Sequence, residues 1–235
     1  MLPGEHEHTA LRNSGIPRVS VKRIEADGVS VFFREAGPPD APVVLLLHGF
    51  PTSSFMYREL ILRLADNYRV IAPDLPGFGF TNVPAALGYK YTFDALARTL
   101  LAFTDALQLK RYVLYVFDYG APTGLRLALA RPERVTAIIS QNGNAYEEGL
   151  GDAWAPIQRY WRQPTAENRE AVRRELSPEG LKSQYTYGVP HPERIAPEGQ
   201  EGPDVSRQVR PRQCALPRLQ ARRHNLRRPA LGLDL

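Results

Sequence analysis

The sequence has a single cysteine and no long apolar run. Because Cys214 has no second cysteine to pair with, an internal disulfide framework is excluded, as is typical of a reducing compartment. No stretch approaches the roughly 18 consecutive apolar residues of a membrane helix. Residues 1–20 also lack the apolar core of a secretory signal. We therefore predict a cytoplasmic protein that does not enter a membrane.

Two common kinds of ligand site are missing as well. The five histidines and the cysteine show no spacing typical of a metal site. No glycine-rich loop of the kind that cradles phosphates is present. We therefore expect neither a metal nor a cofactor.

Positive charge is in excess only near the C-terminus. The net charge is +5, and residues 199–235 account for all of it with eight Arg, no Lys and three acidic residues. Basic and acidic residues are equal in number over the rest of the chain, so no basic groove for nucleic acid is indicated.

Residues 199–235 also contain no Phe, Tyr, Trp or Ile, and their apolar residues follow no helical or strand period. Low hydrophobicity with a high net charge predicts disorder. Three interpretations compete: a solvated basic tail, an arm for nucleic acid or membrane, and a segment that is not a designed protein sequence.

The order of apolar segments predicts an α/β fold. Val19–Ile24 and Val29–Phe33 alternate apolar and polar residues around Asp27-Gly28, which predicts a half-exposed hairpin. The runs Pro42–Leu47 and Arg111–Phe117 are typical of parallel strands covered on both faces. Further strands and helices alternate with them, which implies a mostly parallel sheet with helices on both faces. They are the strands Tyr68–Ala72 and Val135–Ser140 and the helices near Phe55–Ala65, Phe93–Leu107 and Ala121–Ala130.

The pattern changes after residue 143. Aromatic side chains are spread among charged residues without a strand period, which predicts a small helical lid. Lids over the carboxyl edge of such a sheet are where α/β folds bind substrates. The predicted organisation is an N-terminal extension at 1–18, an α/β core at 19–143, a partial helical lid at 144–198 and a basic tail at 199–235.

The chemistry is predicted at Val116-Phe117-Asp118-Tyr119-Gly120, between a buried strand and a helix. A sharp turn at such a junction lifts its central side chain clear of the sheet, and a small residue after it lets helix and strand approach. The helix N-terminus favours an ionised carboxylate at Asp118, which is a nucleophile that needs no activation. An ordinary helix cap is the alternative interpretation of this aspartate.

Two further motifs weigh against a simple cap. His48-Gly49-Phe50-Pro51 follows one strand, and Asp74-Leu75-Pro76-Gly77-Phe78-Gly79 follows the next. Together with VFDYGAP, in this order and spacing, they resemble the α/β-hydrolase superfamily, in the branch of epoxide hydrolases and haloalkane dehalogenases. The resemblance runs from about residue 19 to about residue 198.

The resemblance implies a two-step mechanism. The Asp118 carboxylate attacks an sp³ carbon that carries an epoxide oxygen or a halide, and a water activated by a histidine hydrolyses the resulting ester. The backbone N–H groups of Phe50 and Tyr119 would form the oxyanion hole, in which one donor contributes roughly 2.7–4 kcal/mol. His48 matches the family's HG turn and is expected to be structural.

Two departures bear on the substrate. Dehalogenases typically place a Trp after the nucleophile and an Asn or similar donor after the HG pair, and this chain has Tyr119 and Phe50 there. Epoxide hydrolases more often show the HGFP turn and use lid tyrosines as donors. We therefore expect a small apolar epoxide as substrate. The candidates for contact with it, each of which could equally be a packed lid aromatic, are Trp154, Tyr160, Tyr185 and Tyr187, with Tyr146 as a further possible donor.

A larger departure concerns the base. In this superfamily the histidine base and its orienting acid follow the last strands, after the lid, whereas here the resemblance ends near Glu198. His224 lies in the Arg-rich segment and His191 in the lid region, and we expect neither to be the base. The loss of aromatics with enrichment in Arg and Pro is what a shifted reading frame in a GC-rich gene would produce. We therefore favour a truncated or frameshifted chain whose sheet is incomplete at its C-terminal end.

The consequences of this interpretation are an exposed strand at Val135–Ser140, which invites aggregation, and an alkyl ester that is not turned over. The alternative functions are a hydrolase of the haloalkane dehalogenase type and a non-catalytic remnant that binds a small molecule in the lid pocket.

Overall fold

A computed structural model describes residues 18–175 and 177–195 of the chain. The predicted N-terminal extension before residue 18, the end of the predicted lid and the basic tail lie outside the described residues. Six strands form one sheet in the order β1-β2-β4-β3-β5-β6. Their bounds are β1 Ser20–Ala26, β2 Val29–Ala36, β3 Val43–Leu47, β4 Arg69–Pro73, β5 Tyr112–Phe117 and β6 Val135–Gln141.

The sheet begins with the predicted hairpin and continues as a parallel sheet. β1 pairs antiparallel with β2 and β2 antiparallel with β4, whereas β4, β3, β5 and β6 run parallel to one another. At the hairpin turn Asp27 and Gly28 both have positive φ, 55° and 74°, as a tight two-residue connection requires. The predicted α/β class is therefore confirmed, and the loops after β3, β4 and β5 meet at one edge of the sheet.

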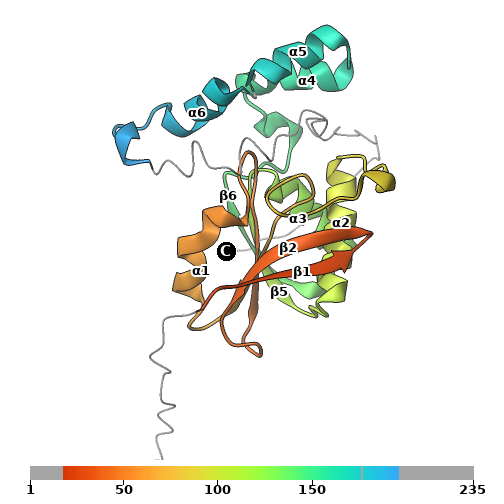
Figure 1. Ribbon diagram of the computed structural model, residues 1–235, viewed down its shortest axis with the longest axis vertical. Helices are drawn as coiled ribbons and strands as arrows, with labels where there is room; N and C mark the ends of the chain where they lie inside the picture. Colours follow the sequence, from red (N-terminus) through yellow and green to blue (C-terminus); the bar gives the residue numbers. More distant parts are fainter. Residues whose placement is uncertain (1–17, 176, 196–235) are drawn as a thin grey trace, which may run out of the picture.

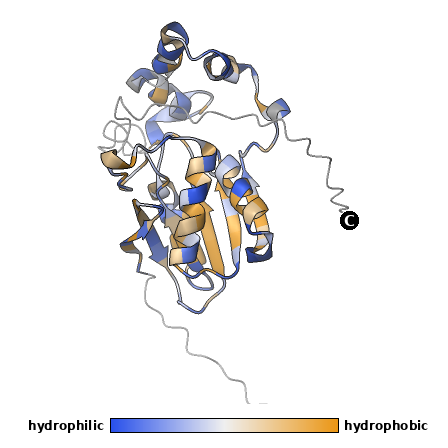
Figure 2. Cartoon of the chain, turned by 90° about the vertical axis from the view of Figure 1, so that its right-hand side faces the viewer, coloured by the Kyte–Doolittle hydropathy of each residue, from blue (hydrophilic) through white to orange (hydrophobic). Residues whose placement is uncertain are grey.

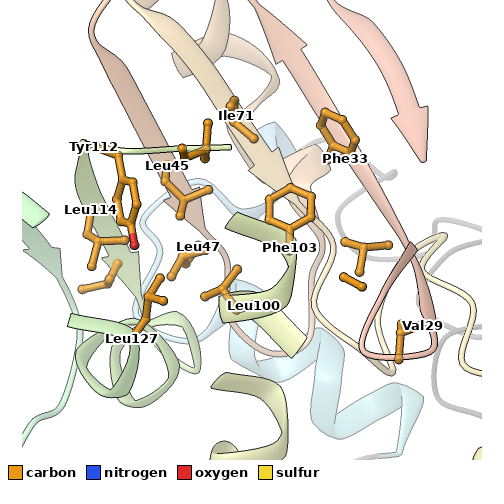
Figure 3. Close-up of a cluster of buried hydrophobic side chains, with 14 of the residues drawn as sticks. Val29, Phe33, Leu45, Leu47, Ile71, Leu100, Phe103, Tyr112, Leu114 and Leu127 are labelled. Atoms are coloured by element: carbon orange, nitrogen blue, oxygen red, sulfur yellow. The ribbon is translucent and has the colours of Figure 1, made fainter. Parts of the chain in front are cut away.

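Helices cover both faces of the sheet (Figure 1). On one side α1 (Arg58–Leu64) packs its Ile61 against Val44, Leu46 and Val70. On the other side α2 (Phe93–Ala106) and α3 (Gly120–Ala130) cover the larger core. Because the apolar residues of β3 are continuous, alternate side chains reach both layers. Figure 3 shows the larger cluster, and in Figure 2 the strands between the helices are the most hydrophobic part of the chain.

The segment predicted as a lid, called the lid below, forms three short helices above the sheet in its described part (Figure 1). They are α4 (Ala155–Arg162), α5 (Ala166–Glu175) and α6 (Pro178–Thr186). Short 3-10 turns complete the described structure: Ser54–Tyr57, Ala85–Leu87, Pro132–Arg134, Glu147–Gly149, Asp152–Trp154 and Pro192–Arg194.

The predicted helix near Phe55–Ala65 is in fact a 3-10 turn over Ser54–Tyr57 followed by α1. The Ser53 hydroxyl caps this turn by accepting the Phe55 N–H, which fixes the start of the segment. Among the described residues, no helix combines the length and the apolar character that crossing a bilayer requires.

Candidate active site

Asp118 lies in the sharp turn between β5 and α3. Its φ is +47°, a left-handed conformation that costs a residue other than glycine of the order of 1–3 kcal/mol. Glycines nearby let the turn form, because a Cβ on Gly120 would lie 2.7 Å from the Leu47 carbonyl carbon and one on Gly124 2.7 Å from Val116 Cγ1. The start of α3 therefore approaches β3 and β5 closely, and Asp118 is held at the sheet edge.

Two backbone N–H groups converge on the Asp118 carboxylate. The Phe50 N–H donates to Asp118 Oδ1 at 2.7 Å, and the Tyr119 N–H donates to the same oxygen at 2.6 Å. Gly49 also packs against this carboxylate, since a Cβ added to Gly49 would lie only 2.7 Å from Asp118 Cγ. The three residues assigned to the nucleophile and the oxyanion hole are thus brought to one point.

The ionisation of Asp118 reflects two opposing effects. Burial raises the pKa of the Asp118 carboxyl, and the hydrogen bonds from the Phe50 and Tyr119 N–H groups lower it. Burial is the larger effect, so the pKa is above its ordinary value. The ionised carboxylate is therefore less well solvated than an exposed one, which increases its reactivity toward carbon.

His48 and Asp74 hold the two loops beside Asp118. The buried Asp74 carboxylate accepts the Ser54 N–H through Oδ1 and the Phe80 N–H through Oδ2, each at 2.8 Å. His48 Nε2 accepts the Leu75 N–H at 2.9 Å. The loop after β3 is therefore joined to the loop after β4 by side-chain bonds. Its position as a charged residue directly after a buried strand is the one sequence signal for Asp74, and that signal alone does not predict the two N–H partners.

The environment of His48 defines its protonation. With Nε2 accepting from Leu75, Nδ1 carries the proton and donates to the Gly49 carbonyl at 2.9 Å. Burial lowers the pKa of His48, although the nearby Asp74 charge and the bond to Gly49 oppose it. His48 is a neutral, fully buried side chain with both ring nitrogens in use. This environment agrees with the structural role expected for it.

An aromatic cluster surrounds the turn. The Tyr119 ring lies 5.2 Å from Phe93, 5.8 Å from Phe50 and 6.2 Å from Phe78, measured between ring centroids. The lid contributes Tyr160 and Val172 to the same cluster. The wall next to Asp118 is therefore apolar and is shared by α2, two loops of the core and the lid.

The predicted lid residues differ in where they lie. Tyr160 is buried and Trp154 half-buried in the aromatic cluster. Tyr185 is half-buried, and this burial raises its pKa. Tyr187 and Tyr146 are 88% and 76% exposed, so the structure does not bring them into the cluster.

Trp161 was not among the predicted site residues. Its ring packs 5.9 Å from Trp154, and it belongs to the aromatic cluster. Its indole N–H is buried and has no hydrogen-bond partner in the described part of the chain. A buried donor without a partner is costly unless a ligand accepts from it, and the sequence carries no signal for such an arrangement.

The site can bind an apolar molecule against an oriented carboxylate. In the described ranges, no three His, Cys, Asp or Glu side chains come together in a way that could hold a metal ion. Asp118, the two N–H donors and the aromatic wall are the groups available for chemistry.

Comparison with known proteins identifies the family to which the chain is similar. A family described as alpha/beta hydrolase fold matches residues 42–176. A hydrolase of Saccharomyces cerevisiae is 47% identical over 175 residues, which is 73% of this chain and 60% of the yeast protein. Haloalkane dehalogenase 2 of Mycobacterium tuberculosis is 41% identical over 106 residues, which is 45% of this chain and 35% of that enzyme.

The fold is also similar to a solved epoxide hydrolase from Vigna radiata. That structure has a TM-score of 0.54 and 27% sequence identity, over 74% of this chain and 53% of the plant enzyme. The chain thus spans 60% or less of the length of these three relatives.

Proposed function

The chain belongs to the α/β-hydrolase family, and on this basis we propose that it acts on small apolar epoxides through an ester on Asp118. The observation that carries the proposal is the convergence of the Phe50 and Tyr119 N–H groups on Asp118 Oδ1. A carboxylate that only capped α3 would need neither the positive φ of Asp118 nor a donor from the loop after β3.

The proposed first step forms a covalent bond. A carboxylate oxygen of Asp118 attacks one ring carbon, the C–O bond to that carbon breaks, and the epoxide oxygen leaves as an alkoxide that takes up a proton. The product is a hydroxyalkyl ester that contains every atom of the epoxide. The Phe50 and Tyr119 N–H groups hold the carboxylate in line, so little reorganisation is needed when it reacts.

The lid supplies the candidate donors for the leaving oxygen. Tyr160 brings a hydroxyl to the aromatic cluster, and the buried Trp161 N–H has no partner in the described residues. An indole N–H can donate to an alkoxide or to a halide, so Trp161 does not distinguish the two substrate classes. It supports a substrate with an acceptor atom near the lid.

The residue after the nucleophile favours the epoxide. Tyr119 has no indole N–H for a halide, and its ring is buried among three phenyl groups. Phe50 offers only its backbone N–H, which points to Asp118. A departing halide would therefore find neither the indole nor the amide donor that the dehalogenase type typically places directly beside the nucleophile.

The second step requires a base. Of the histidines that the structure describes, His48 has both nitrogens in use and His191 is exposed beside Glu193. His224 lies outside the described residues. We propose that this 235-residue chain forms the ester faster than it hydrolyses it, so that the adduct accumulates.

Intact-protein mass spectrometry tests the proposal with a matched pair of reagents, a terminal epoxide and the bromoalkane of the same carbon skeleton. Opening of an epoxide adds its whole mass, whereas displacement of a halide adds the alkyl group alone. We expect the epoxide adduct on the wild-type chain and no adduct on Asp118→Asn.

Two outcomes would contradict the proposal. Faster labelling by the bromoalkane would assign the chain to the dehalogenase type. The absence of any adduct, in protein that circular dichroism shows to be folded, would support a non-catalytic binding protein instead.

A further inference from the structure

Three arginines and two phenylalanines form a continuous row beside α1. The Phe32 ring is contacted by two guanidinium groups, with Arg23 Cζ 5.6 Å and Arg34 Cζ 5.3 Å from the ring centroid. The Phe55 ring is likewise contacted by Arg34 Cζ at 5.6 Å and by Arg58 Cζ at 4.7 Å. Arg34 is therefore the middle arginine and shares one ring with each of the other two. These five residues are called the arginine row below.

The register of the hairpin explains how the row forms. Arg23 of β1 pairs directly with Phe32 of β2, so the two side chains lie on the same face of the sheet. Arg34 lies two residues further along β2 and therefore on this face as well. Ala36, after another two residues, packs in the core under α1. Since Phe55 belongs to the 3-10 turn that precedes α1, the row lies on the α1 side of the sheet.

Arg34 is half-buried without a counter-ion. No ion pair in the described ranges involves an arginine of the row. Arg34 Nε is buried and has no hydrogen-bond partner in the same part of the chain. The adjacent Glu35 points to the opposite face, where Lys22 and Arg69 bind it. The other half-buried arginines each have a carboxylate or carbonyl acceptor, and they are Arg69, Arg126, Arg131 and Arg134.

The acidic residues closest in sequence do not neutralise the row. Glu25 lies on β1 two residues after Arg23, and Glu59 follows Arg58 in α1. Both glutamates are exposed, and neither forms an ion pair with a described residue. A positive charge that is partly removed from water is costly unless an anion compensates it. The row therefore attracts an anion, most strongly at Arg34.

The geometry of the row favours a phosphate group as this anion. Because the rings cover the faces of the guanidinium groups, their N–H edges remain available, and such edges bind carboxylate or phosphate oxygens in pairs. One edge donor of Arg23 and one of Arg58 already donate to carbonyl oxygens, which fixes both side chains. A phosphate has enough charge and acceptor oxygens for two guanidinium groups, whereas one carboxylate matches a single guanidinium fork.

We propose that the arginine row is a binding site for a phosphate group, with Arg34 as the central donor and Arg58 and Arg23 as flanking donors. No residue of the row belongs to the aromatic cluster around Tyr119, so the site is separate from the proposed active site. A free phosphate compound and a phospholipid headgroup present the same chemistry to these arginines.

Isothermal titration calorimetry of the full 235-residue chain with inorganic phosphate, in chloride at constant ionic strength, tests the site. We expect saturable binding by the wild type. Arg34→Met removes the central charged donors and should weaken binding by about tenfold or more. Arg63→Met is the matched control, because it removes the same charge from an exposed arginine near the other end of α1. It should bind phosphate like the wild type.

Arg58→Met gives a second result that does not depend on a half-buried position. Arg58 is exposed, so this variant should fold like the wild type and bind phosphate several-fold more weakly. Circular dichroism checks that Arg34→Met is folded. Acetate, which offers one carboxylate and a single charge, should compete much more weakly than phosphate.

Cosedimentation with phosphatidylcholine vesicles, with and without phosphatidic acid, distinguishes the two sources. Retention by phosphatidic acid that Arg34→Met loses and Arg63→Met keeps would assign the lipid headgroup. Phosphate binding without retention would assign a free phosphate compound. A wild-type chain that binds no phosphate, a folded Arg34→Met variant that binds like the wild type, an equal loss in Arg63→Met, or acetate competing as strongly as phosphate would overturn the proposal.

Discussion

Gly49→Ala is a sharp perturbation of the proposed nucleophile. The new Cβ would lie 2.7 Å from Asp118 Cγ and closer still to Asp118 Cβ and Oδ1. Ordinary carbon contacts are about 3.5–4.0 Å, so the carboxylate or the loop must move by about 1 Å. A displacement of this size costs an oriented reaction about 100-fold in rate. Crowding at a packed position also costs about 1–3 kcal/mol of stability.

The rate constant for covalent labelling of the chain by an epoxide, followed by intact mass, measures this effect without requiring turnover. Gly151→Ala makes the same chemical change at a glycine whose Cβ would meet nothing within 4 Å, and it should label at the wild-type rate. Labelling of Gly49→Ala at the wild-type rate would refute the assignment of the Gly49–Asp118 contact to a working site.

Three further predictions concern stability. Because burial raises the pKa of Asp118, the fold prefers the protonated acid. Asp118→Asn should therefore raise the melting temperature at neutral pH. This gain should begin to shrink as the pH falls through the raised folded-state pKa and should be gone below the unfolded pKa of about 3.9. The Glu35 carboxylate accepts from Arg69 Nε at 2.6 Å and from Lys22 Nζ at 2.5 Å. Glu35→Gln should therefore lower the free energy of unfolding by about 2 kcal/mol. Most of this loss should come from the Arg69 pair, because Lys22 is mostly exposed. Burial alone would raise the pKa of Glu35, but these two partners lower it. Denaturant titrations should thus show the full effect above the unfolded pKa of about 4.3 and its loss as the pH falls through the lower folded value. Asp74→Ala leaves the Ser54 and Phe80 N–H groups without their acceptor and should cost about 3 kcal/mol and slow labelling of Asp118.

The parts of the fold that follow from local pattern were predictable. The continuous apolar runs before His48 and Asp118 predicted β3 and β5, because only a strand covered on both faces needs such a run. The Asp27-Gly28 turn predicted the hairpin for an equally local reason. β2 extends to Ala36, three residues beyond its predicted end, because its last residues pair with β4 across the sheet.

The parts of the site that depend on tertiary contacts were not predictable. Trp161 and Phe93 come together with Tyr119 only because the lid packs over α2, and no periodicity in the sequence encodes that contact. The bonds of Asp74 to two loop N–H groups likewise depend on how the loops after β3 and β4 fold against each other. The strand-to-helix pattern predicted Asp118 as the nucleophile and the family resemblance implied its two donors, whereas their surroundings required the structure.

The central claim, that Asp118 is a nucleophile, is tested most directly by peptide mass spectrometry after incubation with a terminal epoxide. Cleavage after Arg and Lys releases the peptide Tyr112–Arg126, in which Asp118 is the only carboxylic side chain. We predict that this peptide gains the full mass of the epoxide and that fragmentation places the gain on Asp118. An unmodified peptide from folded protein, or an adduct on any other residue, would contradict the claim.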